Sequence, residues 1–189
     1  MDNKERFQAL VKKHIHCEGI DDLMAWLEES DFYSAPASAR YHGAYPGGLL
    51  EHSLHVYDEL QRLLTAYPEV ECDDQTAAII SLFHDICKVH MYVTEKRNRK
   101  NEFGQWEQYD SYRIEEKFKF GGHGSKSVFL LQNFINLTPE EAVAVNCHMG
   151  AFADEHVGGS FEAYPLAFLL HVADGAATYI LEGKRDGEI

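Results

Sequence analysis

The chain has few basic residues for its length. Seventeen Lys and Arg residues stand against 31 Asp and Glu residues in 189 positions, which gives a formal net charge of −14 at pH 7. Proteins bind the phosphate backbone of nucleic acids through clustered positive charge, so this balance argues against a long nucleic-acid footprint. A single phosphate ester remains a feasible substrate, because bound cations can supply the local positive charge that the side chains lack.

Cysteine is sparse as well, and long apolar runs are missing. The four cysteines, Cys17, Cys72, Cys87 and Cys147, form no CxxC pair. This favours free, mostly buried thiols over disulfides or a thiolate zinc site. The N-terminal stretch is charged and lacks the apolar segment of a signal peptide, and no run reaches the length that spans a membrane. We therefore expect a cytoplasmic protein without a membrane partner.

Helical periodicity dominates the sequence, and no internal repeat divides it. We expect one domain over residues 1–189, with a loose tail at 183–189. The helix expected at 74–89 is apolar nearly all round, so it should be central and buried. The predicted helices cover residues 3–14, 21–29, a segment that follows Pro46-Gly47-Gly48, 74–89, a segment around 128–134, a segment that opens with a capping box at Thr138, and 164–181.

One segment has a different pattern. Between residues 91 and 115, three short stretches (91–93, 106–109 and 112–114) resemble strands, and Asn101-Glu102-Phe103-Gly104 has the composition of a turn. The sequence thus predicts a small β-hairpin inserted in a mainly α domain. Its basic residues are expected at a solvated tip, with the cover of a bound nucleotide as the alternative. These residues are Lys96, Arg97, Arg99 and Lys100.

Several of the eleven histidines fall where periodicity predicts core. His52 lies on the apolar face of its helix, His84 and Asp85 end the most apolar helix, and Asp174 lies in PLAFLLHVADGAATYIL. A single buried histidine is readily satisfied by a backbone carbonyl. A buried carboxylate, however, is costly unless it is paired or bound to a cation. Because helical bundles hold divalent metals with nitrogen and carboxylate ligands from facing helices, the whole set predicts a buried metal site.

The segments GGLLEHSLHV, LFHDICKV and HVADGAATY are similar to the three signature stretches of the HD-domain superfamily of metal-dependent phosphohydrolases. The resemblance covers roughly residues 40–182 and implies an HD-type helical bundle. It implies metal ligands at His52, at the doublet His84 and Asp85, and at Asp174. It also places Lys88 three residues after the doublet.

Two further histidines resemble those of HD proteins that hold two metals. His123, in GGHGSKSVF, and His148, in VNCHMGAF, each lie at a predicted helix end beside glycine. The resemblance then implies two divalent ions, bridged by Asp85, with Fe, Mn, Ni, Zn and Mg all open. The alternative is a single metal, with His123 and His148 in contact with a substrate phosphate. The expected ligand set is His52, His84, Asp85, His123, His148 and Asp174.

The expected catalytic residues are Asp85 and Lys88. Two cations roughly 3.5–4 Å apart activate a water molecule and polarise a phosphoryl oxygen. Lys88 can neutralise charge that develops on the phosphate, unless it only extends into solvent at a helix end. His171, one turn before Asp174, is either a hydrogen-bond partner of a ligand or an ordinary packed residue.

Substrate contacts are expected from the loop before the His52 helix and from the helix that follows His123. The candidates are Arg40, His42, Tyr45 and Lys126. The expected substrate is a small phosphorylated metabolite, foremost a nucleotide, and the sequence does not separate monoesters from diesters. The opening GGLLEH also resembles the HD domain of bacterial 3′–5′ exoribonucleases, whose separate nucleic-acid-binding domain this chain has no room for.

Two other functions fit the same residues. The six ligands are also similar to those of HD-fold oxygenases such as myo-inositol oxygenase, which hold a mixed-valent di-iron pair. Redox behaviour separates the two, because an oxygenase needs iron and consumes oxygen, whereas a hydrolase accepts a redox-inert ion. A non-catalytic nucleotide-binding HD module is the third interpretation, which the loss of a ligand would favour, and no expected ligand is lost. The sequence leaves open whether the chain forms a homodimer.

Overall fold

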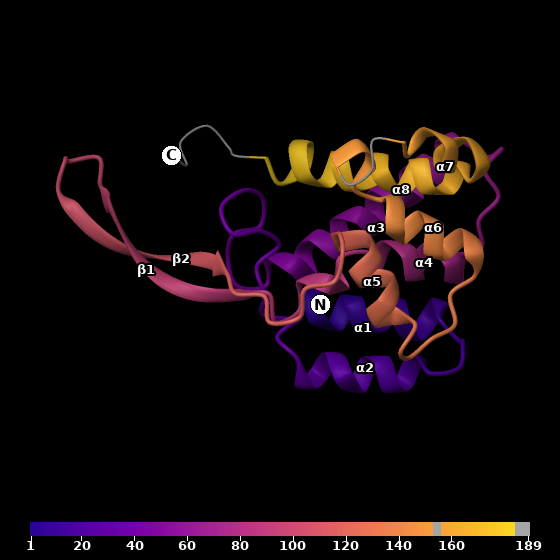
Figure 1. Cartoon of the computed structure of the whole chain (residues 1–189), viewed down its shortest axis with the longest axis horizontal. Helices are drawn as coiled ribbons and strands as arrows, with labels where there is room; N and C mark the ends of the chain where they lie inside the picture. The colour runs from indigo at the N-terminus through magenta and orange to yellow at the C-terminus, as the bar shows by residue number, and fades with distance from the viewer. Residues whose placement is uncertain (153–155, 184–189) are drawn as a thin grey trace.

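The computed structural model of the chain describes residues 1–152 and 156–183. Its helices pack around one hydrophobic core, and a two-stranded arm projects from them (Figure 1). The mainly α architecture with a small β-hairpin is the one expected from the sequence. Of the predicted tail at 183–189, all but Gly183 lies outside the described residues. Among the described residues, no helix is both long enough and apolar enough to cross a membrane.

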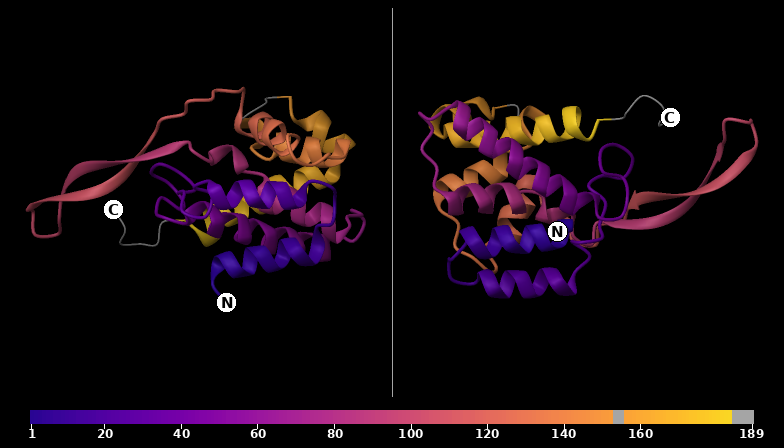
Figure 2. Two further views of the ribbon diagram at one scale, coloured as in Figure 1. Left: turned by 90° about the horizontal axis from the view of Figure 1, so that it is seen from below. Right: turned by 180° about the vertical axis from the view of Figure 1, so that it is seen from behind.

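The N-terminal helices form one side of the bundle. α1 (Asn3–His14) and α2 (Ile20–Glu29) lie side by side, and α1 packs on α3 (Gly48–Ala66) and α4 (Asp74–Phe83) (Figure 2). The side chain of Asp2 caps α1 in a capping box, which satisfies backbone N–H groups of its first turn. Phe7 of α1 meets Phe83 of α4 with ring centroids 5.6 Å apart. This aromatic contact joins the N-terminal layer to the central helix.

The central helix is α4, as its sequence predicts. Its residues from Ala77 to Phe83 are all buried, and α3 packs against both α4 and α8 (Pro165–Ala176). α5 (His123–Leu131) and α6 (Pro139–Cys147) pack on each other, and α6 contacts α8. The predicted capping box at Thr138 is present at the start of α6. Two short elements, the 3₁₀ helix η2 (Gly150–Phe152) and α7 (Gly158–Ala163), precede α8.

Two predicted helix ends differ from the structure. α4 ends at Phe83 rather than near residue 89, and a separate 3₁₀ helix, η1 (Ile86–Lys88), follows it. Asp85 lies between the two helices with φ −105° and ψ 19°, a conformation that breaks the helical path and is common at active sites. At the other end of the chain, α8 stops at Ala176 and continues as the π-helix η3 (Ala177–Leu181). Both breaks lie beside predicted site residues.

The hairpin is longer than the sequence pattern indicates. β1 (Tyr92–Lys100) pairs in antiparallel register with β2 (Trp106–Ile114), from Tyr92 opposite Ile114 to Lys100 opposite Trp106. The predicted turn is present, where the side chain of Asn101 accepts hydrogen bonds from the backbone N–H groups of Phe103 and Gln105. The two strands extend away from the helices in every view (Figures 1 and 2).

The expected position of the basic residues at the hairpin tip is wrong, because all four lie within β1. Their expected solvent exposure holds for Lys96 and Arg99, whose side chains are 60% and 55% exposed. Cross-strand ion pairs join Lys96 to Asp110 and Arg99 to Glu107, each at 2.6 Å. The Arg97 guanidinium contacts Glu95, and the Lys100 ammonium lies 5.5 Å from the centre of the Trp106 ring. The basic residues thus have partners within the arm.

Candidate metal centre

The break after α4 places His84 at the centre of the bundle. His84 is the C-cap of α4 and has no solvent exposure. Its Nδ1 lies 2.8 Å from the backbone carbonyl of Ser81, to which it can donate a hydrogen bond. The Nε2 atom is thereby left with a lone pair directed away from α4 and toward the other histidines.

Two more histidines are held in the same way. His148 is the C-cap of α6 and is fully buried, and its Nδ1 lies 2.7 Å from the carbonyl of Val145. His52, on the buried face of α3, has its Nδ1 3.1 Å from both carboxylate oxygens of Glu182. All three rings thus direct Nε2 inward while an acceptor binds Nδ1–H. A second hydrogen bond of this kind fixes the tautomer that a metal-binding histidine requires.

Asp85 lies between these rings. Its Oδ2 atom is 3.6 Å from Nε2 of His52, 3.4 Å from Nε2 of His84 and 2.5 Å from Nζ of Lys88. Its Oδ1 atom lies 3.5 Å from Nε2 of His148. One oxygen of this carboxylate therefore faces two histidine nitrogens and the other oxygen faces a third, an arrangement that suits a bridging ligand.

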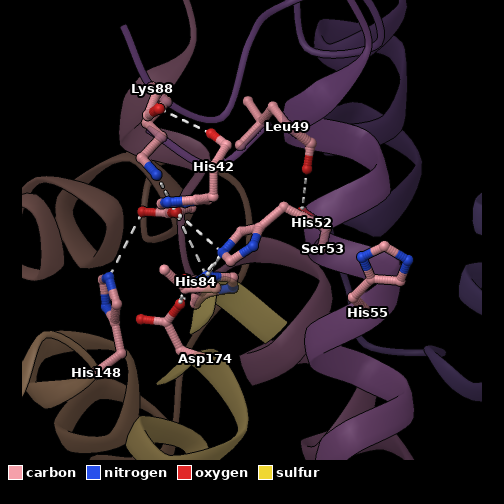
Figure 3. Close-up of polar contacts among 12 residues, drawn as sticks. His42, Leu49, His52, Ser53, His55, His84, Lys88, His148 and Asp174 are labelled. Carbon is pink, nitrogen blue, oxygen red and sulfur yellow. Dashed lines mark hydrogen bonds and ion pairs between the residues drawn. The ribbon is translucent and has the colours of Figure 1, made fainter. Parts of the chain in front are cut away.

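The remaining predicted ligands complete the cluster. Asp174, on α8, has Oδ1 3.2 Å from Nε2 of His52. Ligand atoms of His84, His148 and Asp174 lie within 4.8 Å of one another, as do those of His123, Asp85 and Cys87. Figure 3 shows His52, His84, His148 and Asp174 pointing toward one another, whereas His55 points away from them. The structure thus brings together all six residues expected as ligands.

The electrostatics of the cluster favour ionised carboxylates. Burial opposes the charge on Asp85, but Lys88 and His84 outweigh it and hold the pKa of the carboxyl well below its usual range. Burial also opposes the charge on Asp174, but the hydrogen bond to His52 lowers the pKa of Asp174. The pKa of His84 is lowered, chiefly by burial. Burial opposes the charge on His52 and His148, but hydrogen bonds to Asp174 and Glu182 raise the pKa of His52 to about 9, and the Asp85 carboxylate raises the pKa of His148. A bound cation would take the place of a proton at these two rings, and carboxylate oxygens beside imidazole nitrogens form a donor set that suits a divalent cation.

A second observation also indicates that these residues can hold a metal ion. Nδ1 of His123 is buried without a hydrogen-bond partner among the described residues, and Nε2 of His148 is buried at 3.5 Å from Oδ1 of Asp85 without forming a hydrogen bond. A buried nitrogen without a partner is costly in a folded protein and requires an explanation. A bound cation supplies one for each of these two atoms, and both histidines belong to the predicted ligand set.

Close backbone packing sets the distance between His123 and His148. Gly124, next to His123 at the start of α5, lies against α6 so tightly that an added Cβ would stand 2.1 Å from the carbonyl oxygen of Asn146. No side chain fits there without displacement of one helix. This contact places the histidine that opens α5 near the histidine that ends α6.

The predicted substrate residues have different surroundings. The His42 ring lies 4.9 Å from the His52 ring, and its Nε2 is buried without a hydrogen-bond partner among the described residues. Arg40 is exposed in the same loop, and the Tyr45 hydroxyl donates to Glu51 at 3.0 Å. Lys126 is buried in an ion pair with Glu116 and lines a cavity of about 520 Å³ with Tyr92 and Phe118. His42 thus contacts a predicted ligand.

Two residues at the centre were missed by reasoning from the sequence. Glu182 lies beyond the last predicted helix, and no spacing rule ties it to His52. Cys87 lies two residues after Asp85, and its Sγ is 3.9 Å from Oδ1 of that residue. Burial and the charge of Asp85 raise the pKa of Cys87 to about 12, so it stays a protonated thiol. All four cysteines are free, as expected.

His171 bonds the backbone carbonyl of a predicted ligand rather than the side chain of one. Its Nδ1 lies 2.7 Å from the carbonyl of His148, and its ring stacks on Phe161. The two interpretations open for this residue both hold in part, because it is packed and it also supports the end of α6.

Comparison with known proteins adds a family and one relative. A family model described as HD domain matches residues 49–177. The dihydroneopterin 2′,3′-cyclic phosphate phosphodiesterase of Methanocaldococcus jannaschii is 30% identical over 100 residues, which make up 51% of this chain and 36% of that protein. The chain thus spans only about a third of the length of this relative. No solved structure gives a significant match.

Proposed function

Because the chain belongs to the HD-domain family, we propose that it is a metal-dependent phosphohydrolase that cleaves a phosphoester of a nucleotide or another small phosphorylated metabolite. The observation that carries the proposal is the orientation of His52, His84 and His148. Each directs Nε2 toward Asp85 while its Nδ1 meets a fixed acceptor. A core histidine that only satisfies its own hydrogen bonds has no need for a shared carboxylate at this position.

We further propose that the centre holds two divalent ions. The division of the two Asp85 oxygens supports this, with Oδ2 toward His52 and His84, and Oδ1 toward His148. When bound, the ions supply the Lewis acidity that activates water and polarises a phosphoryl oxygen. His123 and Asp174 complete the six ligands, since each offers an atom within 4.8 Å of other members of the set.

Lys88 is proposed to act on the phosphate. Its ammonium group lies against Oδ2 of Asp85, and its side chain is only 7% exposed. Burial lowers the pKa of Lys88, but the charge of Asp85 outweighs this and raises it, so Lys88 stays protonated. A phosphoryl oxygen held beside Asp85 would lie within reach of this cation, which can neutralise negative charge in the transition state. In Figure 3 the side chain of Lys88 points into the cluster.

The substrate class is proposed from the relative. That protein is named as a phosphodiesterase of a 2′,3′-cyclic phosphate, so a cyclic diester of a small metabolite is the first class to test. The net charge of −14 supports a small substrate over a long nucleic acid.

The proposal is tested by metal analysis and a hydrolysis screen on the same preparation. We expect about two equivalents of metal per chain, and Mn²⁺-dependent hydrolysis of bis-p-nitrophenyl phosphate or of a nucleoside 2′,3′-cyclic phosphate. p-Nitrophenyl phosphate separates monoesterase from diesterase activity. Two irons with oxygen uptake and no hydrolysis would instead indicate an oxygenase. Tight nucleotide binding without turnover would indicate a binding module.

His42 is proposed to contact the substrate phosphate. Burial, followed by repulsion from His52, lowers the pKa of His42 to about 4, so the ring is neutral at pH 7 and can donate one N–H. We expect His42→Ala to raise KM roughly tenfold, the scale of one lost hydrogen bond to a charged group. Steady-state kinetics check this, with the exposed His90→Ala as the control. An unchanged KM with reduced metal content would assign His42 to the metal centre instead.

A further inference from the structure

Two carboxylates hold the His52 ring from opposite sides. Oδ1 of Asp174 lies 3.2 Å from Nε2, and both oxygens of Glu182 lie 3.1 Å from Nδ1. Asp174 belongs to the predicted ligand set, whereas Glu182 belongs to no predicted site. Asp174 lies in α8, and Glu182 is the C-cap of the π-helix η3, which continues directly from α8.

The π-helix accounts for the position of Glu182. The backbone N–H of Glu182 donates to the carbonyl of Ala177, five residues earlier, at 2.9 Å. In a regular α-helix, residues eight apart lie roughly 80° apart around the axis, so Glu182 would not share a direction with Asp174. The wider π turn changes this phase, and such turns are frequent at functional sites. The break in α8 thus allows both carboxylates to reach one imidazole.

A second histidine of α3 holds Glu182 in place. Nδ1 of His55 lies 2.8 Å from Oε1 of Glu182. The Glu182 side chain is only 4% exposed, although it lies two residues after the exposed Ile180. His52 and His55 are three residues apart on α3, so their side chains lie on neighbouring turns and can reach one carboxylate. The chain of contacts therefore runs from the metal centre through His52 and Glu182 to His55.

We propose that Glu182 is a positioning residue of the metal centre, which accepts the Nδ1–H of His52 and thereby directs the Nε2 lone pair to the metal. This rests on the proposed metal-dependent function. Glu182 lies outside the residues 49–177 that match the family model, so the family pattern does not include it. Because it is the only one of the three Nδ1 acceptors that carries a charge, it also makes the His52 ring a stronger donor than His84 or His148.

The test compares Glu182→Ala and Glu182→Gln with Glu59→Gln, a control on another glutamate, which pairs with Arg62 on α3. Each full-length variant is stripped of metal and titrated with Co²⁺ against a chelator, while the visible absorption of Co²⁺ reports ligand geometry. We expect Glu182→Ala to bind Co²⁺ about 10–100-fold more weakly, with an altered spectrum. Glu182→Gln keeps an oxygen acceptor and should lose less. Glu59→Gln should match the unmodified protein.

Unchanged Co²⁺ affinity and spectrum in Glu182→Ala would overturn the proposal. If Glu182→Ala loses helical circular dichroism, His55→Ala replaces it, because this change removes the partner that holds Glu182 but leaves Glu182 itself. An unchanged Co²⁺ spectrum in both His55→Ala and Glu182→Gln would then count against the positioning role of Glu182. Hydrolysis is measured separately. If Co²⁺ binding depends on Glu182 but the protein cleaves no phosphoester, the proposed function is refuted and the positioning role of Glu182 stands. Absence of Co²⁺ binding in the unmodified chain would refute both.

Discussion

Replacement of Asp85 by alanine is expected to lower phosphoester hydrolysis by about three orders of magnitude, the upper range for loss of one principal electrostatic group in an active site. The Asp85 carboxylate lies 3.4–3.6 Å from Nε2 of His52, His84 and His148, with one oxygen toward the first two and the other toward the third. Without it, the two proposed cations lose their shared anion and repel each other. Bound metal should therefore decrease together with activity.

Metal content by elemental analysis and initial rates at saturating Mn²⁺ check this expectation. Asp85→Asn is the second variant, because it keeps the volume of the side chain but removes the charge. The matched control is Asp110→Asn in β2, where the carboxylate pairs with Lys96 far along the arm and is 58% exposed. Full turnover in Asp85→Ala, with two metals still bound, would remove Asp85 from the centre.

The same substitution is expected to destabilise the metal-free protein by about 3–5 kcal/mol. Lys88 is buried, and its ammonium group has Asp85 as its ion-pair partner at 2.5 Å. Removal of Asp85 leaves this positive charge without compensation in the core, which costs more than the lost pair itself contributes. The double variant Asp85→Ala/Lys88→Met should regain most of the stability, because methionine fills a similar volume without a charge.

Urea unfolding in the presence of a chelator measures both variants without a contribution from bound metal. The double variant should stay inactive while its free energy of unfolding returns toward that of the unmodified chain. This outcome separates the catalytic loss from misfolding. A double variant no more stable than Asp85→Ala would show that Lys88 is not the source of the destabilisation.

The doublet His84 and Asp85 could be predicted as site residues from the sequence because it follows an apolar helix, where a buried polar side chain needs a partner. His52 and Asp174 could be placed for the same reason, since periodicity predicts burial and burial implies a partner. The helical bundle followed from the same spacing. The mainly α HD fold with one hairpin is confirmed.

The local breaks could not be predicted in this way. Apolar periodicity continues through residues 84–89, so nothing in it indicates that α4 ends at Phe83 and that a 3₁₀ helix follows. Glu182 was missed for a related reason, because its contact with His52 depends on a π turn that hydrophobic spacing does not report. The basic run at 96–100 was assigned to a tip, since charge in a short segment resembles a solvated turn, whereas cross-strand pairs stabilise it within β1.

The two tryptophans of the chain lie in different environments, one in the projecting arm and the other among the helices. Trp106 begins β2 and is 72% exposed, whereas Trp26 lies in α2 with its ring 5.5 Å from that of Phe134. A two-stranded ribbon has little stability of its own and depends on the helices at its base. Intrinsic fluorescence therefore carries two signals: Trp26 reports the integrity of the helical body, and Trp106 reports the solvent and any molecule that meets the arm. In a Trp26→Phe variant, the remaining tryptophan fluorescence would come from Trp106 and would report on the arm alone.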